Sequence, residues 1–116
     1  QPAFQRAMLE LLKAEAAAGR VPPWQPACLE DRIALHEGRL QTYGTQFDWD
    51  DDGRMSPRPI ADPEGVDARR ASVGLGPLDA AIARQRALAA DLSPPSDMSA
   101  HRAAHHAWAV SVGWRR

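Results

Sequence analysis

Prolines and glycines interrupt this chain at short intervals and limit it to short segments of regular structure. Ten prolines and eight glycines are spread over 116 residues. Neither type suits a helix interior, because proline lacks the amide donor and glycine loses the most backbone freedom. Breaks at Gly19, Gly38, Gly74 and Ser93–Ser96 therefore predict a series of short helices. The length suits one domain with a modest core.

Apolar periodicity and end signals predict where these helices lie. One should span Ala3–Ala18, and a second should run from about Pro26 to Glu37, with proline in its first turn. A short helix should start with Asp62 as its N-cap, and another should follow Gly76–Pro77. The apolar faces comprise Phe4, Ala7, Met8, Leu11 and Leu12, then Leu29 and Ile33, then Leu78, Ile82, Gln85 and Leu88.

A hairpin is predicted between the second and third helices. Leu40–Trp49 is rich in Thr, Tyr, Phe and Trp, which favour strands, and Asp50–Gly53 is a turn. Arg54–Ile60 can return as an edge strand, since it contains two prolines. The predicted fold class is therefore mainly α, a small helical domain with an inserted two-stranded β-hairpin at about residues 40–60. We place this domain at 1–92 and expect a weakly helical C-terminal tail at 93–116.

Composition excludes several functions. The formal net charge of −1 argues against nucleic acid as a partner. The single cysteine, Cys28, allows no internal disulfide and is expected to be a small core residue. No apolar run reaches the ~20 residues of a membrane span, and no signal peptide is visible, so we expect a cytoplasmic protein without membrane partners. Phosphate-loop, dinucleotide-binding, paired-cysteine and nucleophile-elbow motifs are all missing, so no cofactor is expected.

The run from Glu37 to Phe47 is the main candidate site. It concentrates uncharged hydrogen-bonding side chains between a helix and an acidic turn. In a strand, Gln41, Tyr43 and Thr45 would share one face, and with Gln46 they would orient a ligand by hydrogen bonds. The alternative is a structural network in which these groups satisfy one another.

Three arginines complete the predicted ligand-binding set. Arg32, Arg69 and Arg70 carry guanidinium forks that suit carboxylate or phosphate. Neighbouring helix residues point about 100° apart, so at most one of Arg69 and Arg70 should face the hairpin. The alternative is that these arginines form ion pairs with an aspartate, among Asp31, Asp48 and Asp62, and hold the hairpin down.

Two further patterns suggest a metal site, and we expect neither to be one. The Asp48-x-Asp50-x-Asp52-Gly53 run opens like a calcium loop, but its twelfth position is Pro59 instead of glutamate. His101 and His105 have helical ligand spacing, with His106 beside them, yet no glutamate lies between them. We expect an exposed turn and a surface helix. His36 ends the second predicted helix and could act as a general base or as a cation at the helix C-terminus.

Several motifs resemble a bacterial family of domains of unknown function. The chain contains Asp31-Arg32, then Gly38-x-x-Gln41-x-Tyr43-Gly44-Thr45-Gln46, then Asp67-x-Arg69-Arg70-x-x-x-Gly74-Leu75, in the order typical of that family. The resemblance covers roughly Ala3 to Arg84. It implies no known activity. It also implies a segment upstream of Pro2–Gln5 carrying a Gln–His pair, which a longer chain or a second polypeptide would supply.

Three functions follow as hypotheses. The first is the binding of a small polar or anionic ligand through the hairpin and the nearby arginines. The second is an enzyme, a hydrolase or transferase, in which Tyr43 or His36 does acid–base work and the upstream segment contributes. The third is an interaction module or homo-oligomer that uses one of its four tryptophans as an anchor.

Overall fold

The computed structural model describes residues 1–116 and confirms the predicted class. Its α-helices are α1 (Pro2–Ala17), α2 (Trp24–His36), α3 (Val66–Ser72), α4 (Leu78–Leu88) and α5 (Met98–Ser111), and a 3-10 turn, η1 (Pro63–Gly65), precedes α3. One antiparallel hairpin joins β1 (Phe47–Trp49) to β2 (Met55–Pro57). None of the helices combines the length and apolarity that crossing a bilayer requires.

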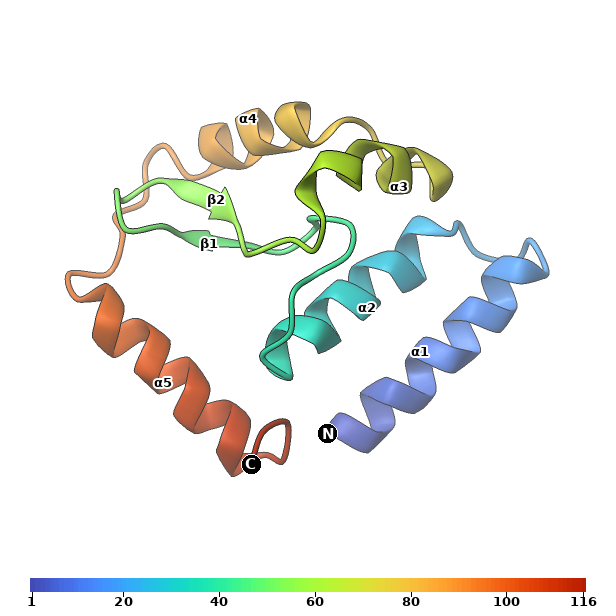
Figure 1. Ribbon diagram of the computed structural model, residues 1–116, viewed down its shortest axis with the longest axis horizontal. Helices are drawn as coiled ribbons and strands as arrows, with labels where there is room; N and C mark the ends of the chain where they lie inside the picture. The colour runs from blue at the N-terminus through green and yellow to red at the C-terminus, as the bar shows by residue number, and fades with distance from the viewer.

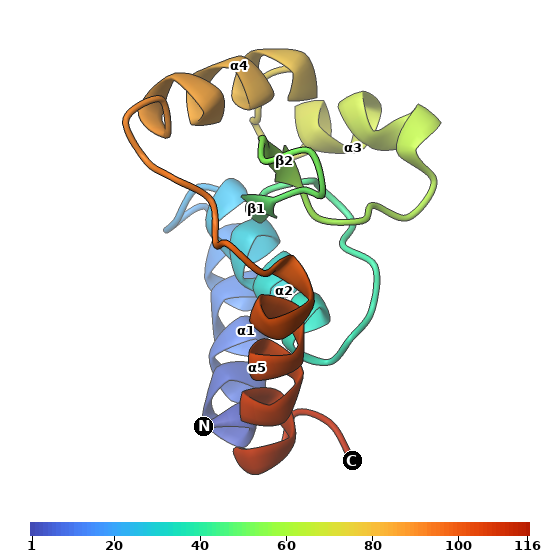
Figure 2. The ribbon, with the colours of Figure 1, turned by 90° about the vertical axis from the view of Figure 1, so that its left-hand side faces the viewer.

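The hairpin separates two groups of helices (Figure 1). α1 packs against α2, while α4 covers β2 and has α3 beside it. Seen from the side, the hairpin, α3 and α4 form one end of the molecule, and α1, α2 and α5 extend from it toward both termini (Figure 2). The radius of gyration is 15.1 Å, against about 13 Å for a tightly packed chain of this length. The molecule therefore has little apolar interior.

Local signals set most helix ends. Gly19 adopts φ +75° just after α1, and Gly38 adopts φ +80° after α2, as the predicted stops require. Asp62 occupies the predicted N-cap position, with Pro63 next to it at the start of η1, but it does not cap in the expected way. Its backbone is left-handed (φ 42°) and its carboxylate caps no amide, lying instead 3.6 Å from the Arg69 guanidinium. The predicted face of α4 is also wrong at Leu88, which is 71% exposed.

The apolar core is a cluster contributed by three helices and the C-terminal segment. Leu9 of α1, Ile33 of α2, Ala109 of α5 and Trp114 pack together. The expected weakly helical tail thus contains a regular helix, α5, and Asp97 caps it by accepting a hydrogen bond from the Ala100 amide.

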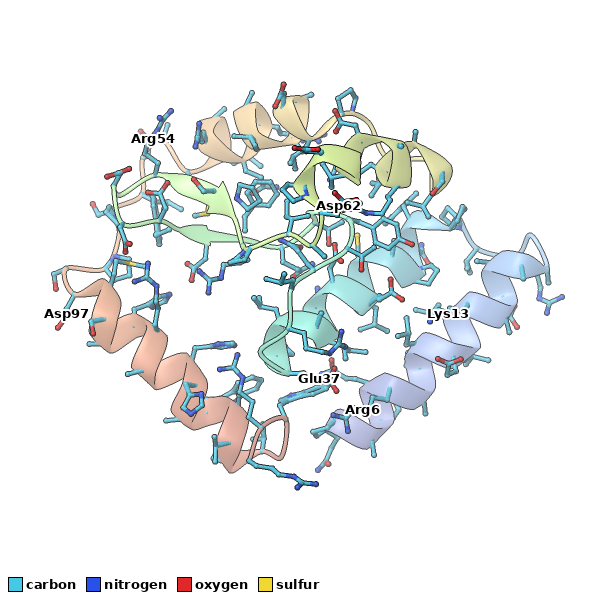
Figure 3. The ribbon with its side chains drawn as sticks, in the orientation of Figure 1. Arg6, Lys13, Glu37, Arg54, Asp62 and Asp97 are labelled. Atoms are coloured by element: carbon cyan, nitrogen blue, oxygen red, sulfur yellow. The ribbon has the colours of Figure 1, made fainter.

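An arginine of α1 closes the outer side of this cluster. Arg6 points toward Glu37 at the end of α2 (Figure 3), and its Nη2 lies 2.7 Å from that carboxylate. Its guanidinium also lies over the Trp114 ring, 5.1 Å from the ring centre. One exposed side chain therefore ties α1, α2 and the C-terminal segment together.

The predicted strand over Leu40–Trp49 is wrong in its first seven residues. Only Phe47–Trp49 pairs with β2, and residues 41–46 form a loop with a single bridge, from Gln41 to Ile60. The return strand is likewise shorter than predicted. Gln41, Tyr43 and Thr45 consequently do not share the face of a strand.

Candidate functional site

A buried carboxylate organises the 41–46 loop. Asp31 of α2 is fully buried. Its Oδ1 accepts hydrogen bonds from the amides of Thr42 (2.8 Å) and Tyr43 (3.1 Å), and its Oδ2 accepts from the amide (3.0 Å) and hydroxyl (2.8 Å) of Thr45. These charge-assisted bonds take the amides that a strand ladder would have used. The loop curls around Asp31, and this explains why no strand forms here.

The Gln41 side chain closes the base of the hairpin. This residue is 1% exposed, and its amide nitrogen donates to the carbonyls of Gln46 (3.0 Å) and Arg58 (2.7 Å). Its Oε1 accepts from the Gln46 amide at 3.0 Å. The side chain thus joins both arms of the hairpin just beyond the last residue pair of the β1–β2 ladder, Phe47 and Pro57.

Both arginines of α3 reach the same loop. Arg69 donates to the carbonyl of Thr42 (2.8 Å), and the buried Arg70 donates to that of Tyr43 (2.9 Å). The prediction that at most one of them faces the hairpin is therefore wrong, because both long side chains reach neighbouring carbonyls of the loop. Arg70 also donates to the Gly76 carbonyl at 2.7 Å, and burial lowers its pKa.

The other predicted ligand-binding residues lie in different surroundings. Gln46 donates to the Thr45 hydroxyl at 3.1 Å, so it belongs to the same network. Arg32 is exposed and makes no hydrogen bond or ion pair. The Tyr43 ring lines a recess of about 170 Å³ with Lys13 and Glu30, and burial raises its pKa, with a further contribution from the Glu30 carboxylate. Of the four predicted ligand-binding residues of the loop, Tyr43 is thus the one that lines a recess.

A larger cleft lies between the hairpin, the end of α2 and α5. Its volume is about 320 Å³, within the range of small-molecule sites. Seven of its nine lining residues are ionisable, and one of these is acidic. The lining consists of Leu35, Phe47, Asp48, Arg58, His101, Arg102, His105, His106 and Arg115, and we call it the cationic cleft.

Most of the cleft's charged groups already have protein partners. The Asp48 carboxylate lies 2.9 Å from His101 Nε2, and Arg102 lies 2.5 Å from Asp51 outside the cleft. Arg115 donates to the Leu35 carbonyl at 2.8 Å at the end of α2, where a cation also meets the negative end of the helix dipole.

Arg58 differs from these groups. Its side chain is half-buried, and its guanidinium takes part in no hydrogen bond or ion pair. Its backbone, by contrast, is held on both sides, since its amide donates to the Gln46 carbonyl (2.9 Å) and its own carbonyl accepts from Gln41. A fixed backbone therefore presents a free guanidinium to the cleft.

His105 lines the cleft, and the ring of His36 lies next to it, outside the lining. The rings of His36 and His105 are 5.7 Å apart, and His36 also contacts Trp108 and Trp114. Burial lowers the pKa of both, and the nearby Arg115 acts in the same direction. His36 Nδ1 is buried without a hydrogen-bond partner, which favours the neutral ring. The suggested role of His36 as a helix-terminal cation is thus disfavoured.

The patterns that suggested metal sites have other roles. Asp50 Oδ1 accepts from the amides of Asp52 and Arg54, both at 2.9 Å, and so stabilises the hairpin turn. No group of three histidine, cysteine or acidic side chains comes together to hold an ion. His101 pairs with Asp48, a contact that helical spacing alone did not suggest.

Sequence reasoning missed Arg58, Arg102 and Arg115 as site residues. Arg58 directly follows β2, Arg102 lies in α5 and Arg115 lies in the C-terminal segment, so no common motif links them. The only signal was the run of histidines in α5, which has one side on the cleft.

Together these features define a small, mainly α domain whose hairpin is held by a buried carboxylate and two arginines, with a cationic cleft beside it. Residues 1–91 match the Family of unknown function (DUF6624), and the chain belongs to that family. The match contains the whole loop network, whereas α5, which forms one wall of the cleft, lies beyond it. No curated protein and no solved structure matches the chain.

Proposed function

We propose that this domain binds a small anionic ligand, a carboxylate or a phosphate, in the cationic cleft. The free guanidinium of Arg58 carries the proposal. A half-buried arginine loses part of its hydration, and without a partner no protein contact offsets that cost. A bound anion would offset it. Arg115, which is held by neutral carbonyls, adds positive charge beside it. Arg102 is paired with Asp51, and Asp48, the one carboxylate of the lining, is paired with His101.

The loop network supports this proposal indirectly. The polar groups of this network form hydrogen bonds with other parts of the protein, as seen for Asp31, Gln41, Arg69 and Arg70. They therefore hold the loop in place and leave few groups free to contact a ligand there. Because Gln41 bonds to the Arg58 carbonyl, the network positions the arginine that faces the cleft. A pre-organised donor loses little entropy when a ligand binds.

An NMR titration of the ¹⁵N-labelled protein with inorganic phosphate and with acetate tests the proposal. We expect amide shifts around Arg58 and α5, and Arg58→Gln should weaken binding about tenfold or more, since a charge-assisted bond contributes about 1.5–3 kcal/mol. Arg54→Gln is the matched control, because Arg54 is an exposed, unpaired arginine of the same hairpin outside the cleft. Equal weakening by both variants, or no binding by the unaltered protein, would refute the proposal.

A further inference from the structure

The shape of the cationic cleft narrows the class of anion. Its cations come from three separate parts of the chain: Arg58 from the hairpin, Arg102 from α5, and Arg115 from the C-terminal segment. A planar carboxylate carries one charge and two oxygens, and one guanidinium fork satisfies it. A phosphate group carries nearly two charges and three terminal oxygens, which suits donors arriving from several sides.

His105 is the titratable group best placed to respond to such a ligand. Its ring lies half-buried in the wall of the cleft and makes no hydrogen bond. Both ring nitrogens of a protonated imidazole are donors, whereas a neutral ring offers one donor and one acceptor. Protonation would therefore give the cleft a donor and a charge that it lacks when empty.

The charged surroundings of His105 oppose its protonation in the free protein. It faces His36 of α2, Asp48 and Arg58 of the hairpin, Arg115 of the C-terminal segment, and His101, Arg102 and His106 of its own helix. Burial and the two arginines Arg115 and Arg58 lower its pKa, against a smaller opposing effect of Asp48. A dianion between these groups would offset the repulsion from the arginines.

We infer that the ligand of the cleft carries a phosphate group and that His105 takes up a proton when it binds, an inference that rests on the anion site proposed above. The ligand raises the pKa of His105 relative to the free protein. Between these two pKa values, binding takes up a proton, so affinity increases as pH falls. Sulfate is a useful probe because it has the same tetrahedral shape and stays a dianion across this range.

Isothermal titration calorimetry with sulfate, inorganic phosphate and acetate, each in two buffers of different ionisation enthalpy, tests the inference. We expect phosphate and sulfate to bind about tenfold or more tightly than acetate, with net proton uptake for sulfate at neutral pH. His105→Gln should abolish most of that uptake and weaken sulfate binding at about pH 6, while affinity at about pH 8 stays near that of the unaltered protein. The affinity at the higher pH also shows that the variant is folded.

The other outcomes separate this inference from the anion site itself. Sulfate binding without proton uptake, or uptake that persists in His105→Gln, overturns the role of His105. Acetate binding as tightly as sulfate overturns the phosphate class and leaves the anion site standing. Absence of binding for all three anions overturns both proposals.

Discussion

Replacing Asp31 should destabilise this protein more than any other single change to a polar residue. Its carboxylate holds three backbone amides and the Thr45 hydroxyl, and it is fully buried. Asp31→Ala leaves these four donors without an acceptor, at about 1–3 kcal/mol each in a buried setting. Because the loop residues themselves are half-buried, water can reach part of the gap, so the lower end of that range applies. We expect a total loss of about 4 kcal/mol.

Asp31→Asn isolates the contribution of the charge from that of the shape. Asparagine keeps an oxygen for Thr42 and Tyr43 but places an NH₂ group against the Thr45 amide, and two donors then face each other. We expect a loss of about 2–3 kcal/mol, part of it from the missing charge.

Urea unfolding followed by circular dichroism measures both losses directly. A domain of this size has a total stability of only about 6–17 kcal/mol, so they are easily resolved. The matched control is Asp91→Asn, an exposed aspartate without partners, which should change stability by less than about 0.5 kcal/mol. If Asp31→Asn costs no more than this control, the loop does not depend on the carboxylate and the reasoning fails.

Three further predictions concern the same region. Arg70→Lys should lower the free energy of unfolding in urea by about 1–3 kcal/mol, because an ammonium group cannot reach both the Gly76 carbonyl and the 41–46 loop. An unchanged unfolding midpoint would show that Arg70 does not stabilise the fold by joining these two segments. Gly44→Ala should cost about 1–2 kcal/mol, since Gly44 has φ +65° and an added Cβ would lie 3.0 Å from Ile60 Cδ1; a neutral effect would show that the loop can rearrange. The lowered pKa of His36 predicts that its contribution to stability is complete above about pH 6.5 and is lost as pH falls below it, because the unfolded chain then binds more protons than the folded one. In His36→Gln, the plot of unfolding free energy against pH should be flatter over this range. An unaltered slope would assign the effect to other groups.

The conformational preferences of single residues were enough to predict several helix ends and the hairpin turn. Gly19 and Gly38 end their helices because only glycine adopts positive φ without strain, and Asp50–Gly53 forms its turn with hydrogen bonds from within four residues. The mainly α class with a hairpin also followed from the spacing of breakers and apolar residues. These outcomes need no knowledge of the rest of the chain.

The conformation of residues 40–46 depends on residues distant in sequence and could not be predicted from the local pattern. The sequence from Leu40 to Gln46 favours a strand, yet Asp31 takes its amides first, because a buried carboxylate is a stronger acceptor than a backbone carbonyl. The sequence indicated Gln41, Thr45 and Gln46 as one group and allowed only one of Arg69 and Arg70 to join it, whereas both do. It also left open whether this group binds a ligand or only other parts of the protein.

The cationic cleft exists only in the tertiary structure. Arg58 follows a proline in an edge strand, and nothing near it in the sequence distinguishes it from any exposed arginine. It becomes a candidate anion-binding residue only because Gln41 fixes its backbone and α5 folds across from it. Helix ends and turns depend on contacts within a few residues and can be read from the sequence of this protein, whereas a site assembled from three distant segments depends on how those segments pack.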